Sequence, residues 1–301
     1  MGKILFVGDP HINASTPASR KDVYSTTVLN KIRSIGKLVE ERNIGAVIYL
    51  GDMFSAKWQP ITYVIDAIDA LNTIKCPQYS IIGNHDLVYE RIESFDSSPL
   101  SLLQRAGVVN ILGELNIDDK VLVKGFNYTD NLSSKEFNGF KICVAHCFYN
   151  NERFGGTNHN LNPEDALKLG YQAYVLGHDH TPYPDVENSA FKVIRPGSLM
   201  RGSSHEYNLK RGIEVVEFDS DSLQFTHLQL PCDKPEDVFR ERVYVEKEQE
   251  PELTLDEVIK NLDYAQDDSI YTILDEAEMP EKNRQLICKY LEAHGIYRTT
   301  V

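Results

Sequence analysis

The chain has 301 residues, of which 42% are hydrophobic, and this is enough for one large core or for one core with a small additional module. No apolar run approaches the ~18 residues of a membrane span, and the N-terminal stretch MGKILFVGDPH has too short an apolar segment for a secretory signal. We therefore expect a cytoplasmic protein. The five cysteines are an odd number without a C-x-x-C pair, which favours reduced thiols over disulfides or a zinc ribbon.

The net charge of −14 argues at first sight against a nucleic-acid partner. The charge is unevenly distributed, because residues 232–301 carry eighteen acidic and nine basic side chains, a net of −9. Residues 1–231 carry a net of only −5. Two bound divalent cations would bring this larger part close to neutral.

The first part of the chain alternates strands and helices. The apolar run at 3–7 predicts a buried strand, and the apolar spacing within 22–43 predicts a helix. A second strand is expected at 46–50, a second helix at 61–74 and a third strand at 78–82. This order indicates a parallel α/β unit.

From about residue 108 the pattern changes to mostly strands, which favours two sheets packed face to face with helices outside. The expected elements are strands at 121–126, 141–146, 173–178, 191–198, 212–218 and 223–230 and a short helix at 163–169. After Pro231 the chain becomes charge-rich, and Thr254-x-x-Glu257 predicts a capping box at the start of a helix. We predict a catalytic domain at 1–231 and a small acidic α+β module at 232–301, with a last helix near 281–294.

Polar side chains recur where the predicted strands end. Parallel strands bring their carboxyl ends to one edge of a sheet, so these side chains should converge. The mixture of imidazole, carboxylate and amide groups suits manganese, iron or zinc, and it is too large for one ion, so a two-metal site with a shared carboxylate is expected. Each residue alone has an ordinary alternative, such as a helix cap for Asp86 or a core histidine for His146. The residues are Asp9, His11, Asp52, Asn84, His85, Asp86, His146, His178 and His180.

In this order, the motifs D-x-H, G-D, G-N-H-D, H and G-H-x-H resemble the calcineurin-like metallophosphoesterase superfamily over about residues 3–217. The resemblance implies a four-layer αββα sandwich with two divalent metals. It implies that His85 contacts the phosphate or protonates the leaving oxygen, oriented by Asp86. The implied ligands are Asp9, His11 and His180 for the first metal, Asn84, His146 and His178 for the second, and Asp52 as the bridge.

The segment after the last motif indicates a branch of the superfamily. Residues 193–218, with a strand, a Pro-Gly-Ser turn and a Lys-Gly-hydrophobic return, resemble the SbcD-type double-strand-break repair nucleases. The Asp-Arg-Gly of protein phosphatases is missing after Asp52. This branch implies a DNA exonuclease and endonuclease in repair or recombination, with Mn²⁺ as the expected metal. It also implies an SMC-like ATPase partner and a homodimer. Residues 232–301 could be a capping or partner-binding module or an inert appendage.

Several residues near the motifs could form an electropositive rim with one stacking platform for a nucleic acid. Each of them could equally be an ordinary surface residue, and Trp58 could be partly buried. The acidic charge favours the alternative of a phosphodiesterase or phosphatase acting on small nucleotides or phosphoproteins. A non-catalytic scaffold of the same fold should have lost ligands. The candidate rim residues are Lys57, Trp58, Arg153, Arg201, Lys210 and Arg211.

Overall fold

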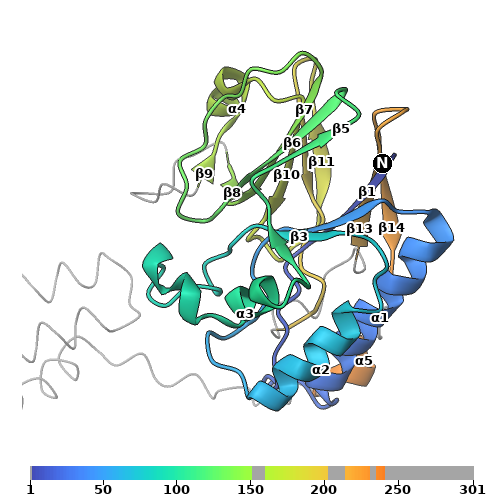
Figure 1. The fold of residues 1–301 in the computed structure, drawn as a ribbon, viewed down its shortest axis with the longest axis vertical. Helices are drawn as coiled ribbons and strands as arrows, with labels where there is room; N and C mark the ends of the chain where they lie inside the picture. The colour runs from blue at the N-terminus through green and yellow to red at the C-terminus, as the bar shows by residue number, and fades with distance from the viewer. Residues whose placement is uncertain (1, 151–159, 203–213, 231–234, 241–301) are drawn as a thin grey trace, which may run out of the picture. The chain divides into compact units, whose positions relative to one another are not determined.

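The computed structural model describes residues 2–150, 160–202, 214–230 and 235–240, and Figure 1 shows their arrangement. The predicted helices beginning near residue 254 and at 281–294 lie outside the described residues. Among the helices that are described, none is long and apolar enough to cross a membrane.

The first sheet is six-stranded and contains the predicted parallel unit. Strand β1 (Lys3–Val7) is central, with parallel strands on one side and, on the other, two strands that follow by successive antiparallel pairings. In spatial order the strands are β14 (Gln224–Gln229), β13 (Glu214–Asp219), β1 (Lys3–Val7), β2 (Ala46–Tyr49), β3 (Gln78–Ser80) and β4 (Asn110–Ile111). The predicted strands of this sheet are therefore confirmed, and the short β4 is an addition.

The second sheet is also six-stranded, with a parallel centre and an antiparallel strand at each edge. Its strands in spatial order are β11 (Tyr183–Glu187), β12 (Lys192–Arg195), β10 (Ala173–Gly177), β7 (Phe140–His146), β6 (Val121–Phe126) and β5 (Glu114–Ile117). The two short strands β8 (Phe148–Tyr149) and β9 (Asn160–Leu161) form a separate parallel pair. The edge strands β5 and β11 were not among the predicted elements.

The two sheets pack face to face between helices, as predicted. Along β1, Ile4 and Phe6 belong to the apolar cluster between the sheets, whereas Leu5 and Val7 belong to the cluster under the helices. This alternation follows from the two-residue period of a strand. The helices against the first sheet are α1 (Tyr24–Arg42), α2 (Ile61–Leu71) and α3 (Pro99–Arg105), and α4 (Pro163–Leu169) covers the second sheet (Figure 1).

Local sequence explains where the two short helices begin. The Asn162 side chain accepts a hydrogen bond from the Asp165 amide at 2.9 Å, and Pro163 follows as the first helical residue of α4. Ser98 and Pro99 play the same parts for α3. The 3₁₀ helix η1 (Ile92–Ser97) leads directly into α3. Both α3 and η1 were missed from the sequence, although Ser98-Pro99 is a recognisable start signal.

Residues 235–240, beyond Pro231, contact the earlier part of the chain again. The described residues belong to one compact unit, Met1–Glu241. Helix α5 (Pro235–Val238) ends where the Val238 carbonyl accepts a hydrogen bond from the Lys21 amide at 2.8 Å, and the Arg240 amide donates to the Ser19 carbonyl at 2.9 Å. The predicted boundary at residue 231 and the C-terminal module stay predictions.

Candidate metal centre

The polar residues at the strand ends lie together where the carboxyl ends of the two sheets meet. Two hydrogen bonds join the sheets directly at this edge. The His178 amide, after β10, donates to Asp9 Oδ2, after β1, at 2.9 Å. His146, the last residue of β7, donates from Nδ1 to the Leu50 carbonyl at 2.7 Å. The convergence expected from parallel-strand topology is therefore present in the structure.

The backbone of this edge adopts conformations that side-chain-bearing residues avoid. His11, Asp52 and His178 have φ values of 48°, 47° and 84°, in the left-handed region. Such conformations cost free energy and persist where the surrounding structure holds them, often at functional sites. In this protein they turn three candidate ligands away from the direction of their strands.

Two glycines of the motifs make room for these side chains. A Cβ on Gly51, whose φ is +96°, would strike the His146 ring, and a Cβ on Gly83 would overlap the Asp52 carboxylate. The glycines in "GD" and "GNHD" thus allow groups from neighbouring loops to approach the backbone closely. The motif spacing reflects this packing requirement as well as the candidate ligands themselves.

The side chains form two groups that share Asp52. The ligand atoms of each group lie within 4.8 Å of one another, and the groups are Asp9, His11, Asp52 and His180, and Asp52, His146 and His178. Asn84 Oδ1 lies 3.1 Å from His146 Nε2 and so belongs beside the second group. This partition matches the one implied by the resemblance.

Asp52 is positioned to serve both groups with one oxygen. Its Oδ2 lies 3.8 Å from His11 Nε2 and 3.3 Å from His146 Nε2. Its Oδ1 accepts a hydrogen bond from the His85 amide at 2.8 Å. Oδ1 is thus held by a backbone amide, while Oδ2 faces imidazoles of both groups.

One acceptor of the first group is left unpaired. Asp9 Oδ1 is buried and has no hydrogen-bond partner among the described residues. His11 Nε2 and His180 Nε2 face each other at 2.8 Å, and His178 Nδ1 lies 3.2 Å from His146 Nε2. Buried polar atoms are normally paired, and imidazole nitrogens that face each other and a carboxylate are typical of ligands turned toward a cation. The residues therefore fit a divalent metal in each group.

The electrostatics of the protein without metal are consistent with that fit. Burial lowers the pKa of His11 to about 3 and raises the pKa of Asp9 to about 6. Burial opposes the charging of His146, but the Asp52 and Asp9 carboxylates raise its pKa to about 10. A proton on His146 then supplies the positive charge that the carboxylates demand, and a bound cation would replace it.

His85 and Asp86 occupy different surroundings. His85 is exposed, and its Nδ1 lies 3.0 Å from the Ser55 carbonyl. The buried Asp86 carboxylate accepts from the Gly83 amide at 2.9 Å and from the Met53 amide at 3.4 Å. This corrects the expectation that Asp86 orients His85, because the Ser55 carbonyl is the group bonded to the His85 ring. Asp86 instead ties the loop after β2 to the loop after β3.

The predicted substrate-binding residues are placed unevenly. Trp58 is 70% exposed, so the alternative of partial burial does not apply to it. Arg201 is buried, and its carbonyl accepts a hydrogen bond from Arg20. Arg153, Lys210 and Arg211 lie outside the described residues. Their contact with substrate stays a prediction in every case.

Three aromatic or basic residues near the centre were missed from the sequence. The Tyr128 ring centroid lies 5.7 Å from that of His178, and the Phe148 centroid lies 4.2 Å from it. Arg195, at the end of β12, lies between the rings of Tyr149 and Tyr183, at 5.5 and 4.3 Å from their centroids. Tyr128 follows the parallel strand β6, so the strand-end rule would have found it.

Comparison with known proteins yields one family and several similar folds. The calcineurin-like phosphoesterase family matches residues 2–182. No curated protein sequence matches the chain. Among solved structures, a protein of Thermus thermophilus is similar at a TM-score of 0.47 and 12% identity over 76% of this chain and 98% of that one. An archaeal phosphodiesterase is similar at a TM-score of 0.43 and 16% identity, over 76% of this chain and 99% of that one. A dimetal phosphatase from Danio rerio is similar at a TM-score of 0.48 and 12% identity, over 72% of this chain and 92% of that one.

Proposed function

Because this chain belongs to the calcineurin-like phosphoesterase family, we propose that it is a two-metal phosphodiesterase acting on DNA, an exonuclease with endonuclease capacity of the SbcD type. It is a hydrolase of that family with a metal-binding site. The observation that carries the two-metal proposal is Asp52, whose Oδ2 faces His11 of one group and His146 of the other. Manganese is the metal we expect, with iron or zinc as alternatives.

Each of the two groups would hold one cation. Asp9, His11 and His180 would hold one metal, Asn84, His146 and His178 the other, and Asp52 would contact both. When bound, two such ions neutralise phosphate oxygens and lower the pKa of a water that can attack phosphorus. The carboxylates and imidazoles keep their ligand atoms in place before any ion arrives, since the surrounding loops fix them.

His85 is the residue we propose as proton donor to the leaving oxygen. The Ser55 carbonyl can only accept a hydrogen bond, so His85 Nδ1 carries a hydrogen. This leaves Nε2 available for substrate, and the exposed ring can reach it. When protonated, Nε2 can donate to the oxygen that departs from phosphorus. Because Asp52 bonds to the His85 amide rather than to its ring, the metal centre and the donor are linked by backbone.

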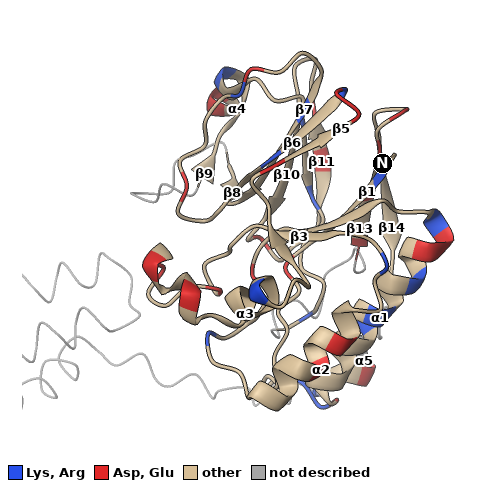
Figure 2. Ribbon diagram, viewed as in Figure 1, with Lys and Arg blue, Asp and Glu red and all other residues tan. Residues whose placement is uncertain are grey.

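Support for a nucleic acid as substrate comes from the loop beside His85. Trp58 is exposed and follows Lys57, and proteins that bind single strands combine an aromatic platform with positive charge. Lysines and arginines of the described residues are otherwise spread among acidic side chains over both sheets and their helices (Figure 2). Phosphate contacts would therefore depend on a few local cations rather than on a broad basic face.

The deciding experiment compares substrates in the presence of manganese. Wild type and His85→Ala are assayed on linear duplex DNA, single-stranded DNA, a nucleotide and bis(p-nitrophenyl) phosphate. We expect wild type to degrade DNA and the variant to lose that activity. Hydrolysis of the small diester with intact DNA would favour the small-substrate alternative and remove the repair assignment. Hydrolysis of none of them would remove the phosphodiesterase proposal.

The proposed partners rest on the resemblance to SbcD-type nucleases. We propose an SMC-like ATPase, docked through residues 232–301, and a second copy of the chain. Light scattering of the purified protein tests the dimer. Co-purification of the full chain with a candidate ATPase, compared with a chain that ends at residue 241, tests the docking segment.

A further inference from the structure

A strained turn follows the G-N-H-D motif directly. Tyr89 and Glu90 have φ values of 51° and 57°, and the Arg91 amide donates to the Val88 carbonyl at 3.2 Å to close the turn. Two consecutive left-handed residues are the pattern that Asn-Gly usually fills in tight hairpins, because larger side chains are strained there. The chain instead places an aromatic ring and a carboxylate in these positions.

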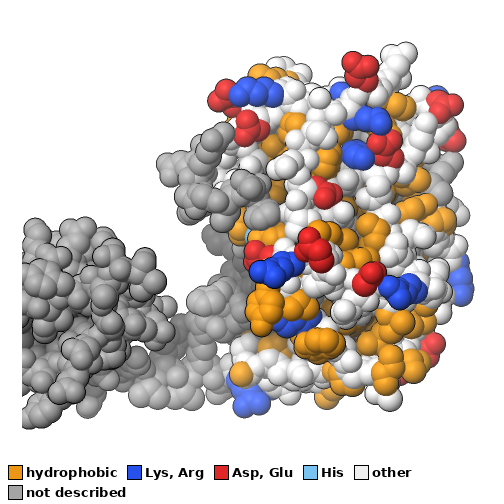
Figure 3. Space-filling model, turned by 60° about the vertical axis from the view of Figure 1, so that its left-hand side comes forward, with side chains coloured by type: hydrophobic (Ala, Val, Ile, Leu, Met, Phe, Trp, Pro, Cys, Tyr) orange, Lys and Arg blue, Asp and Glu red, His pale blue; other side chains and the backbone are white. Residues whose placement is uncertain are grey.

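The aromatic ring of Tyr89, in this strained turn, is exposed to solvent. Tyr89 is 83% exposed, and the Lys57 Nζ lies 4.7 Å from its ring centroid. One side of the ring therefore carries a cation, and the other is available for stacking. Figure 3 shows one face of the molecule, on which exposed apolar side chains lie next to charged ones.

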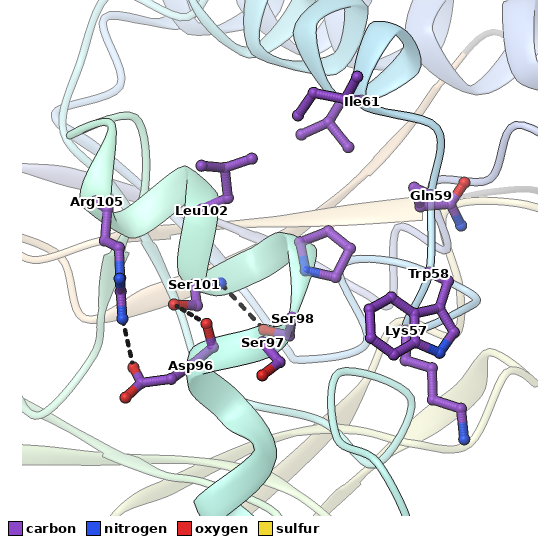
Figure 4. Close-up of a pocket in the computed structure, with 12 residues that line it drawn as sticks. Lys57, Trp58, Gln59, Ile61, Asp96, Ser97, Ser98, Ser101, Leu102 and Arg105 are labelled. Atoms are coloured by element: carbon purple, nitrogen blue, oxygen red, sulfur yellow. Dashed lines mark hydrogen bonds and ion pairs between the residues drawn. The ribbon is translucent and has the colours of Figure 1, made fainter.

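A second exposed aromatic lies on the same loop as Lys57. Trp58 borders a cavity of about 260 Å³, whose far side is formed by η1 and α3. Figure 4 shows Lys57 and Trp58 on the side of the cavity opposite to Arg105. Lys57 thus borders this cavity beside Trp58 and also contacts the Tyr89 ring.

The region around Lys57 and Tyr89 is connected to the candidate metal centre on two sides. The Ser55 carbonyl, two residues before Lys57, lies 3.0 Å from His85 Nδ1. On the other side, the Tyr128 hydroxyl donates a hydrogen bond to the Glu90 carboxylate. The Tyr128 ring centroid is 6.0 Å from that of His146. A group bound at Tyr89 would therefore be held at a fixed position relative to the scissile phosphate.

We infer that Tyr89, with Lys57 and Trp58, forms a base-stacking site that holds a nucleobase next to the phosphodiester at the metal centre. Every base has a π-face, so the site tolerates any sequence, and Lys57 can meet an adjacent phosphate. The inference rests on the proposed phosphodiesterase function and names what the substrate must carry, an unpaired base beside the cleaved bond. The strain at Tyr89 and Glu90 is then part of how the ring is presented.

The test uses two diesters with the same leaving group. One is thymidine 5′-(p-nitrophenyl phosphate), and the other is the same deoxyribose ester without the base. The corresponding 3′ esters are assayed in parallel. We expect wild type to prefer the base-bearing ester in kcat/KM, and Tyr89→Gly to reduce that preference about tenfold or more. Tyr89→Phe should keep the preference, because it keeps the ring.

The glycine variant separates folding from binding. Glycine accepts a positive φ without strain, so Tyr89→Gly should unfold at the same temperature as wild type or higher. Leu223→Gly is the matched control, since Leu223 is also apolar, 40% exposed and left-handed at φ 55°, in the turn between β13 and β14. It should leave the preference unchanged. An equal preference in Tyr89→Gly and wild type would overturn the inference. Failure of wild type on both esters would overturn the proposed function and this inference with it.

Discussion

Two clusters of histidine and carboxylate in this protein differ in how fully their polar groups are paired. His227 on β14 lies between two acids, with Nδ1 2.9 Å from Glu214 Oε2 and Nε2 3.0 Å from Asp185 Oδ1. Lys192 adds a second cation at 3.2 Å from Asp185, and Gln229 donates to Glu214 at 2.6 Å. We name these five residues the His227 cluster. Each nitrogen of the His227 ring faces an acceptor, so the polar groups complete one another.

The candidate metal centre lacks this completeness. Imidazole nitrogens face one another across 2.8 Å at His11 and His180, and Asp9 Oδ1 has no partner in the part of the chain that the structure describes. Both clusters combine acids with histidines, so residue types alone do not separate them. The unpaired Asp9 oxygen does separate them, because a cation would pair with it, whereas both ring nitrogens of His227 already face acids. The predictions below test this difference.

The largest effect should follow Asp52→Asn. The amide keeps the size of the side chain but removes the charge that faces both groups. Two cations sharing a neutral ligand are poorly held, so we expect both metals to be lost together and diester hydrolysis to fall to background. Metal analysis of the purified protein and the bis(p-nitrophenyl) phosphate assay measure the two outcomes.

The matched control for Asp52→Asn is Asp185→Asn in the His227 cluster. It makes the same chemical change at a carboxylate that contacts His227 and Lys192. Metal content and hydrolysis should stay at wild-type levels. Retention of one tightly bound metal by Asp52→Asn would refute the shared ligand.

A smaller loss is expected for His85→Ala. Removal of a proton donor typically lowers the rate by about 10²–10⁴, while the backbone amide that bonds to Asp52 remains. Metal content should therefore stay near stoichiometric as kcat falls. If the metals were lost in parallel with the rate, His85 would itself be a ligand.

Metal binding should also stabilise the fold. Added at about 100 times its dissociation constant, a metal that binds only the folded protein raises the free energy of unfolding by about 2.7 kcal/mol. We expect Mn²⁺ to raise the melting temperature of metal-free wild type and of Asp185→Asn, but not of Asp52→Asn. A rise in all three would indicate binding elsewhere. Thermal denaturation monitored by circular dichroism measures this.

The convergence of the candidate ligands could be predicted from the sequence, for a physical reason. Each one follows an apolar strand, and the carboxyl ends of parallel strands share an edge, so no side-chain geometry was needed to predict that they meet. Gly51 and Gly83 strengthened the pattern, because the structure requires a missing Cβ at both. The four-layer sandwich follows in the same way from the order of strands and helices.

What could not be predicted depends on how loops fold back. The hydrogen-bond partner of the His85 ring is the backbone carbonyl of Ser55. Every residue has a backbone carbonyl, so the sequence does not indicate which one is the partner. Exposure of Tyr89 depends on a turn that its residues do not favour. The His227 cluster joins β11 to β13 and β14, strands of two different sheets, so its residues carry no local motif.

The smallest predicted effect concerns the pH dependence of the His227 cluster. Hydrogen bonds to Asp185 raise the pKa of His227 in spite of its partial burial, and Glu214 adds to the effect. A folded-state pKa above the unfolded value of about 6.5 means that this stabilisation is complete below that pH. It is lost as pH rises through the folded-state pKa. His227→Gln, which keeps hydrogen-bonding capacity without the charge, should therefore cost about 1 kcal/mol at about pH 6.

The difference between wild type and His227→Gln should be smaller at about pH 9 than at about pH 6, because the wild-type ring loses its proton as pH rises. Urea unfolding of both proteins at the two pH values measures it, and the subtraction removes the titration of all other groups. The metal content of His227→Gln should stay that of wild type. A difference that grows with pH would mean that His227 is held neutral between its two acids. Lys192, 3.2 Å from Asp185, would then supply the positive charge of the His227 cluster without help from His227.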